Sequence, residues 1–367
     1  MSKVSILLSS ILTMAVMGAC PRAVHATGGN IIPGSRFVSG RGAALGDAYI
    51  GLVDTVGESL FYNPAALGRI QDFTFEAFNL SLQGNSKLSS TFGTDTYKIQ
   101  TLDGYESTLL KHPNMNPGGG VSLLPAIGFR GFGIGLLYQN RLMGETNGTN
   151  IRYRATYQLI PTVGYGLNLA SGVLRIGYSL QWVNQASGDR TVAVGSRPLG
   201  WTEGLAQGKG FSQTVGLAVS LPFVYQPSIN LVARNIGGLH LSGGTLIGLA
   251  KNSSGTLSDE KMTFDSSFGL THKIGPSLKL STQAAYRDLT NTSASRQISH
   301  AAFGAEASIV DRFSLRAGFG SGYPTAGLGV QTSRAEAHFA WYSEDLGNGK
   351  TPIRDIRYLF QIIFKAI

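Results

Sequence analysis

From about residue 72 to the C-terminus, apolar and polar residues alternate in short runs. The clearest run covers 174–182, where Leu, Ile, Tyr, Leu and Trp alternate with Arg, Gly, Ser and Gln. A period of two predicts β-strands, because successive side chains of a strand point to opposite faces. Charged residues recur at the polar positions, which does not suit a buried soluble core. The pattern favours strands with one face in lipid and the other facing a polar lumen.

The connections between these strands alternate in length. The chain turns tightly at 170–172 and 222–227, whereas long links cover 85–119 and 185–210. Short turns at one rim and long loops at the other are typical of bacterial outer-membrane barrels, and an even number of strands places both termini on the periplasmic side. We therefore predict an all-β, transmembrane antiparallel β-barrel over 72–367, in the outer membrane. Its strands, about fourteen, are predicted near 72–84, 120–130, 131–140, 152–169, 172–184, 211–221, 228–236, 262–272, 277–287, 298–309, 312–319, 324–332, 334–342 and 355–366.

The composition agrees with a membrane barrel and argues against other classes. Glycine accounts for 49 of the 367 residues, only 14% of residues are charged, and the mean hydropathy is +0.06. After residue 26 no apolar run approaches the roughly 20 residues that a spanning helix needs. The net charge is +9, but the basic residues form no cluster, so we expect no nucleic-acid partner. Scattered positive charge is better suited to anionic lipid headgroups or acidic solutes.

Residues 1–26 have the features of a secretory signal peptide: an early Lys3, an apolar run, and small residues before Ala26. Cleavage after Ala26 is one interpretation. The alternative is a lipobox-like sequence ending at Cys20, which would then carry the lipid. Cys20 is the only cysteine, so a chain cleaved after Ala26 has no disulfide to stabilise it.

Residues 27–71 do not alternate. The stretch 40–52 is rich in small residues and predicts a short helix, and Asn63-Pro64 starts a turn readily because proline fixes φ. About 45 residues ahead of a barrel are enough to fold into its lumen as a plug. The alternative is a periplasmic tail that rests on the barrel rim. The predicted organisation is thus a signal peptide (1–26), an N-terminal helical hatch or plug (27–71) and the barrel (72–367).

Residues 41–49 (RGAALGDAY) followed by 62–67 (YNPAAL) resemble the N-terminal hatch of the FadL-type outer-membrane transporters and the related PorV-type barrels. A second resemblance covers 315–329, a strand–loop–strand, so the likeness extends over 36–367. It implies a barrel of fourteen strands. It also implies a hatch or gating motif, which falls here on Gly46, Asp47, Asn63, Pro64 and Ala65. The substrate-binding residues of the family lie in parts that cannot be aligned.

The resemblance implies passive uptake of long-chain fatty acids or other hydrophobic compounds, which would bind in a greasy lumen pocket and leave when the hatch shifts. The alternative is a PorV-like structural or secretion-associated barrel that binds a secretion or envelope protein. Two features depart from the family pattern. The long loops are polar, as at 147–150 and 252–255, which weakens the fatty-acid expectation. The chain also continues for three residues past Phe364 instead of ending on an aromatic residue.

No enzyme chemistry is expected, and no metal or cofactor. The six histidines are dispersed without metal-ligand spacing, and no G-x-S-x-G sequence occurs. Glu336 and His338 share one strand face; they are either a proton-sensitive pair or, as we expect, simply solvated. Aromatic residues near strand ends predict interfacial girdles, unless they reflect strand propensity alone. These residues are Trp182, Trp201, Trp341, Tyr342 and Tyr358.

Overall fold

The computed structural model describes residues 36–366 apart from 94–97, 100, 114, 196–199, 203, 294–295 and 348–350. The predicted signal peptide, both of its alternative processing sites and the first residues of the predicted hatch lie outside the described residues.

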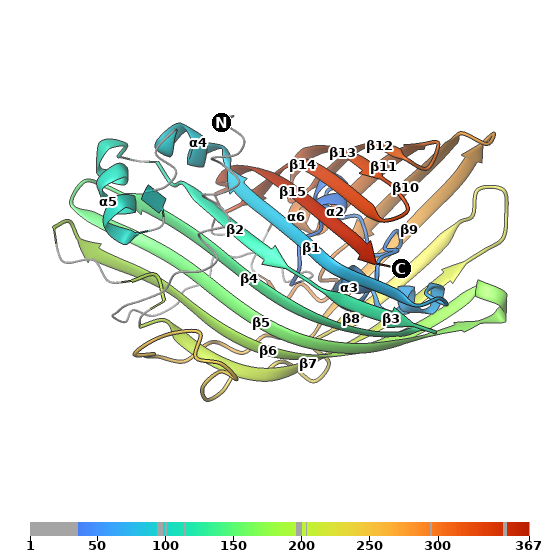
Figure 1. The fold of residues 1–367 in the computed structure, drawn as a ribbon, viewed down its shortest axis with the longest axis horizontal. Coiled ribbons are helices and arrows are strands. Elements are labelled where there is room, and N and C mark those ends of the chain that lie inside the picture. Colours follow the sequence, from blue (N-terminus) through green and yellow to red (C-terminus); the bar gives the residue numbers. More distant parts are fainter. Residues whose placement is uncertain are drawn as a thin grey trace.

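Fourteen antiparallel wall strands form a closed barrel (Figure 1). The second wall strand consists of two pieces, β2 and β3, interrupted at Leu124-Pro125; both pieces pair with β1 and β4. Pairing of β1 with β15 closes the ring. The strands are β1 (Thr74–Asn85), β2 (Gly118–Leu123), β3 (Ala126–Phe129), β4 (Phe132–Thr146), β5 (Asn150–Leu169), β6 (Leu174–Ala193), β7 (Ala206–Ser220), β8 (Ser228–Arg234), β9 (Thr263–Ile274), β10 (Leu278–Tyr286), β11 (Ala301–Ile309), β12 (Phe313–Gly320), β13 (Tyr323–Gln331), β14 (Ala335–Asp345) and β15 (Arg354–Ala366).

The alternation in the sequence separates the two faces of the wall, as predicted. In β6, Ile176 and Tyr178 are exposed on the outside, whereas Arg175, Ser179 and Gln181 are buried inside. The same holds around the barrel, where Phe, Leu, Ile and Tyr form an exposed apolar outer surface. So much exposed apolar area suits acyl chains and not water. Among the described residues, no helix is long and apolar enough to cross a membrane.

The wall is uneven in height. β5 and β6 have 20 residues each, whereas β8 has only 7. The connections at the rim where β1 starts and β15 ends are short, among them the 3₁₀ turn η3 (Ala170–Gly172). The long links lie at the other rim and carry α4 (Ser86–Phe92), α5 (Leu102–Lys111) and α6 (Gln297–His300). Two links at that rim are short, 147–149 and 321–322, so the predicted long–short alternation is confirmed only in part.

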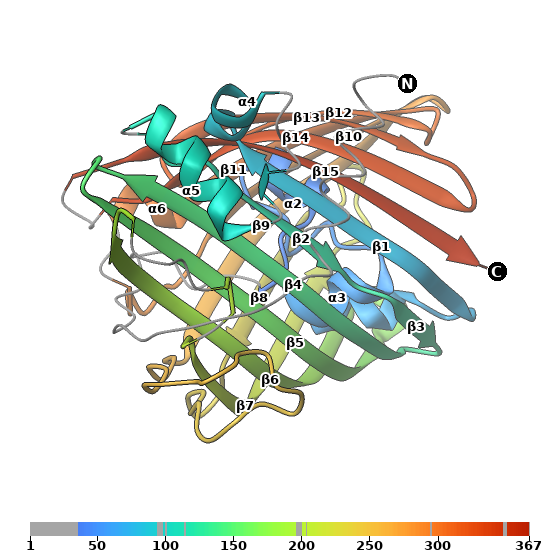
Figure 2. The same cartoon turned by 60° about the vertical axis from the view of Figure 1, so that its left-hand side comes forward.

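The residues before β1 fold inside the barrel as a plug, here defined as residues 36–71 (Figures 1 and 2). It contains α2 (Gly40–Ala44), α3 (Val56–Tyr62) and the 3₁₀ helix η1 (Pro64–Arg69). Helix α2 contacts β12–β15, α3 contacts β1 and β3–β5, and η1 contacts β4–β7. The structure therefore places these residues in the lumen and not on the rim as a tail.

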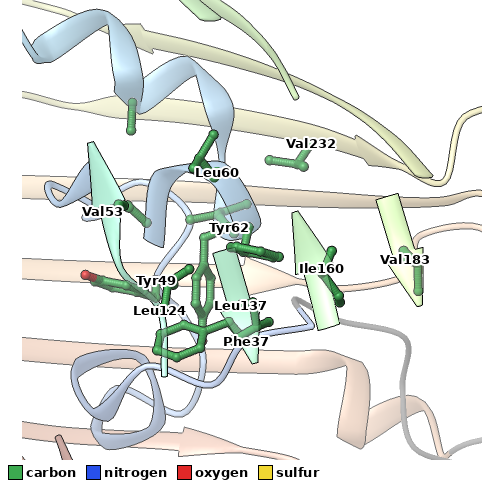
Figure 3. Packing of buried hydrophobic residues seen from close by; sticks show 14 of the residues in the cluster. Phe37, Tyr49, Val53, Leu60, Tyr62, Leu124, Leu137, Ile160, Val183 and Val232 are labelled. Atoms are coloured by element: carbon green, nitrogen blue, oxygen red, sulfur yellow. The ribbon is translucent and has the colours of Figure 1, made fainter. Parts of the chain in front are cut away.

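A hydrophobic core joins the plug to the inner wall (Figure 3). Leu137 and Ile160, on neighbouring strands, are fully buried against plug side chains such as Phe37, Leu60 and Tyr62. Burial of each large apolar side chain contributes about 1.5–3 kcal/mol, so this contact alone favours a docked plug.

The predicted aromatic girdle is only partly correct. Trp182 stacks on Phe211 on the outer face, with ring centroids 5.7 Å apart. Tyr342 instead faces the lumen, where its hydroxyl donates to Gln83. Trp201 packs edge-on against Tyr105 and Tyr153.

The Trp201 cluster lies on the outside of the long strands. Tyr153 is on the same face of β5 as Tyr165, which is exposed in the apolar outer surface, because the register between β4, β5 and β6 has no shift. Helix α5, together with Trp201 and Leu205, covers this face near the long-loop rim. The aromatic side chains there pack under loops and do not contact lipid, which is why a girdle was wrongly predicted at Trp201.

Candidate functional site

The Asn63-Pro64-Ala65 motif begins helix η1 and turns the chain inside the barrel. The Asn63 side chain accepts a hydrogen bond from the Ala65 amide (3.1 Å) and donates one to the Ile50 carbonyl (2.9 Å). Pro64 occupies the first turn, where a missing N–H is tolerated. Asn63 therefore caps η1 and ties it to the preceding loop of the plug.

Two glycines of the wall let this motif approach. A Cβ at Gly177 of β6 would overlap the Pro64 carbonyl, and one at Gly216 of β7 would overlap the Asn63 side chain. No residue with a side chain fits at either position while the plug is docked. The motif thus packs directly against the backbone of two adjacent strands.

Gly46 and Asp47 contact the other side of the barrel. Gly46 has φ +66°, a conformation that favours glycine, and it lies against the backbone of Phe319 and Gly320 in β12. The Asp47 carboxylate pairs with Arg287 at 2.6 Å. The five predicted motif residues therefore form two separate contacts between plug and wall, and the structure does not bring them into one site.

A buried ionic network holds α2 to the wall. The Arg41 guanidinium donates two hydrogen bonds of 2.8 Å to the Glu306 carboxylate and one of 2.7 Å to Asp54. Arg316 donates to the same carboxylate at 2.6 Å. Glu306 is 3% exposed, so removal of either arginine leaves its charge poorly compensated.

The same network shows that Glu336 and His338 are not solvated, contrary to our expectation. Their side chains are buried and 3.1 Å apart, His338 also contacts Arg316, and Glu336 pairs with Lys365. The presence of the plug excludes water from this part of the lumen, which the sequence pattern alone does not reveal.

Gln361 of β15 connects three parts of the molecule. Its side-chain amide donates to Glu58 of the plug (2.9 Å) and to Asn79 of β1 (2.8 Å), and its carbonyl accepts from the Gly40 amide (2.7 Å). Gln361 is fully buried at the closure of the ring. One side chain thereby links the two closing strands to helices α2 and α3 of the plug.

Carboxylates organise helix α3 from both sides. Thr55, its N-cap, makes no side-chain capping bond, and Glu76 of β1 accepts the amides of Val56 (2.6 Å) and Gly57 (2.9 Å) instead. The Tyr49 hydroxyl donates to Glu58 at 2.6 Å. Burial and the Glu58 carboxylate raise the pKa of Tyr49 well above its usual value, so this phenol remains a donor.

A chamber of about 680 Å³ remains in the lumen above the plug. Phe37, Phe61 and Tyr62 of the plug contribute to its floor, and residues 258–261 of a long link border it. Asp259 and Lys261 of that link are exposed, so the chamber is bordered by loop residues on the long-loop side. Its volume is in the range of small-molecule sites, about 300–1,000 Å³.

The chamber wall is mainly polar, which differs from the greasy pocket implied by the family resemblance. On the inner face of β4–β6 lies a row of glutamines. Toward the long-loop rim it is followed by a row of Arg141, Thr156 and Ser187, and then by Arg154 and Asp189. Apolar side chains of the lining come mainly from the plug, such as Val38 and Ala43. Within the described chain, no group of three or more His, Cys, Asp or Glu side chains is arranged to hold a metal ion.

The sequence contains a signal for the plug contacts that the family resemblance does not reveal. Wall glycines at inward positions mark where the plug approaches, for instance Gly164, Gly166 and Gly304 beside Leu60, Gly68 and Leu45. Gln361 carried no recognisable signal, because its role depends on which strands close the ring.

These features define a transmembrane β-barrel of the kind found in bacterial outer membranes, stoppered by its own N-terminal segment. No family model and no curated protein matches the chain by sequence. Among solved structures, the CymD monoaromatic hydrocarbon channel is similar over 91% of this chain and 97% of its own, with a TM-score of 0.52 and 9% identity. The toluene transporter TbuX of Ralstonia pickettii is similar over 90% and 98%, with a TM-score of 0.51 and 11% identity.

The deltaS2 mutant of the TodX monoaromatic hydrocarbon channel gives a TM-score of 0.50 at 10% identity, over 89% of this chain and 97% of that one. The fold of this chain is thus that of the FadL-type barrels. The similar structures are channels and transporters and not enzymes.

Proposed function

We propose that the protein is a passive outer-membrane channel for small hydrophobic compounds, gated by movement of its plug. The observation that carries the proposal is a lumen stoppered near the short-turn rim by the chain's own residues, with a ligand-sized chamber left above them. The Gly131 amide donates to the Ile70 carbonyl at 2.7 Å, which ties the end of the plug to a short turn. Compounds would enter the chamber from the long-loop side and leave when the plug shifts.

The choice of substrate class is supported by the similar structures. Two of them are monoaromatic hydrocarbon channels and one is a toluene transporter. Uptake of toluene into vesicles with a lipopolysaccharide outer leaflet tests the proposal. We expect faster uptake with the protein than in protein-free vesicles; equal rates would refute the channel function.

Gating by the plug has its own test, a reversible disulfide between Gly40→Cys and His338→Cys. A Cβ at Gly40 would lie 3.0 Å from the His338 Cβ, about 0.5 Å below the usual range for disulfides, so a small shift suffices. We expect toluene uptake to fall when the pair is oxidised and to recover on reduction, with the Gly40→Cys single variant unaffected by either treatment. Equal uptake in both states would exclude the plug as gate.

The comparisons give no support to a secretion or envelope protein as partner, and no observation in the described part of the chain favours that alternative.

A further inference from the structure

Three glutamines on adjacent strands form a ladder along the chamber wall. Gln139 of β4 is directly opposite Gln158 of β5, which is directly opposite Gln185 of β6. All three face the lumen and line the chamber. The strand register places the same side chain three times at one height of the wall, so neighbouring amides are close enough to interact across the strands.

The amides of the ladder all point the same way. Gln139 donates to the Arg36 carbonyl of the plug and to Gln158, and Gln158 donates to the Gln185 carbonyl oxygen over 2.5 Å. Aligned amides polarise one another, so the donor at the end of such a chain is strengthened.

That end is the Gln185 amide group, which borders the chamber and is partly exposed. Among the described residues it has no hydrogen-bond acceptor for its two N–H groups. The ladder therefore presents a polarised donor to the chamber, which is suited to an oxygen acceptor on a bound molecule.

The charges around the chamber are largely balanced within the protein. Arg36 pairs with Glu260 (2.6 Å), Arg287 with Asp47 (2.6 Å), and Arg234 with Asp265 (2.8 Å). Arg141 lies 3.7 Å from Glu344. Among the described lining residues, Lys261 is the remaining cation, and it is exposed at the border of the chamber.

An anion in this chamber would lose water without gaining an unpaired buried cation, which is unfavourable. A pure hydrocarbon would leave the Gln185 donor desolvated and unpaired. A neutral molecule with both an apolar part and an oxygen acceptor avoids both penalties, because the chamber lining also has apolar parts, among them the partly exposed Val38 of the plug.

We propose that the chamber selects small neutral compounds that carry a hydroxyl or carbonyl oxygen on an apolar body, with the Gln185 amide as the group that recognises the oxygen. This inference rests on the proposed channel function and narrows its substrate class. The proposed chamber favours an alcohol over the hydrocarbon from which it derives. It also favours the alcohol over the corresponding carboxylate, and fatty acids belong to the carboxylates.

The test compares benzyl alcohol, toluene and benzoate in the same lipopolysaccharide-containing vesicles, after subtraction of uptake by protein-free vesicles. We expect benzyl alcohol to be taken up fastest. Gln185→Leu should lower the rate for benzyl alcohol relative to toluene by about two- to tenfold, the range for one net hydrogen bond. Gln185→Glu has nearly the same volume but lacks the amide protons, and it should lower the ratio as well.

Gln213→Leu is the matched control, since Gln213 is an exposed glutamine on the outer face of β7. It should leave the ratio unchanged. An unchanged ratio in Gln185→Leu and Gln185→Glu, or benzoate faster than benzyl alcohol, would overturn the selectivity while toluene uptake above background kept the channel function. If none of the compounds exceeded the protein-free rate, both proposals would be wrong.

Discussion

Replacement of Gly304 by alanine should loosen the plug without weakening the barrel. Gly304 lies in β11, and a Cβ there would be 2.8 Å from both Cβ and O of Leu45 in the plug. Ordinary contact begins near 3.4 Å, so the plug must retreat by roughly 0.6 Å against a packed core, and overpacking of this kind costs about 1–3 kcal/mol. The strand itself gains about 0.5–1 kcal/mol, because alanine restricts the unfolded chain more than glycine does.

The two effects have opposite signs and can be measured separately. A change of 1–3 kcal/mol in docking raises the population of the displaced plug by about 5- to 140-fold. A larger displaced population exposes the plug amides to solvent, so residues 40–52 should exchange their amide hydrogens faster, as measured by mass spectrometry. The temperature at which the barrel unfolds in detergent should stay the same or rise slightly.

Gly244→Ala serves as the control, because its Cβ would meet nothing within 4 Å. Unchanged protection of residues 40–52 in Gly304→Ala, or an equal loss across the wall strands, would refute the argument that this glycine exists to seat the plug.

Three further changes probe other contacts. Arg41→Gln leaves the buried Glu306 with Arg316 alone and should weaken plug docking by about 3–5 kcal/mol, seen as faster tryptic cleavage within the plug; resistance equal to the unmodified protein would contradict this. Glu76→Gln weakens the cap of α3 and should cost about 1 kcal/mol, measured as faster exchange of the amides at the start of that helix, and unchanged exchange would argue against capping by Glu76. Leu231→Arg places a charge on the outer face of β8 and should destabilise the barrel in vesicles by about 2–4 kcal/mol, measured by denaturant unfolding, whereas no loss would place that face outside the bilayer.

The sequence predicted the wall well because a strand in a membrane barrel has one consistent environment on each face. Eleven of the fourteen wall strands begin and end within about three residues of the predicted ranges, and the closure of the ring agrees with the even count. The largest deviations are at the long-loop ends of β4, β6 and β7, which extend beyond the predicted segments. At these ends the outer face packs under loops, so its residues do not follow the apolar pattern expected of a face in contact with lipid.

The plug was harder to predict, since its contacts are made with residues far away in the sequence. The motif residues from Gly46 to Ala65 were identified through a resemblance, but the groups that hold them, such as Glu306 and Gln361, depend on which strands surround the plug. The polar lining of the chamber could not be predicted from the sequence either. Polar inward positions are expected in any such barrel, and only the register aligns Gln139, Gln158 and Gln185.

The shared hydrogen bonds of Gln361 have a consequence for how the protein matures. The first and last strands meet only after the whole chain is present, and the side chain that bonds across this junction also bonds to the plug. Docking and ring closure therefore reinforce each other. The barrel should therefore close more readily in a chain that contains the plug than in one from which the plug has been deleted. Separation of β1 from β15 would in turn weaken the contacts that hold the plug in the lumen.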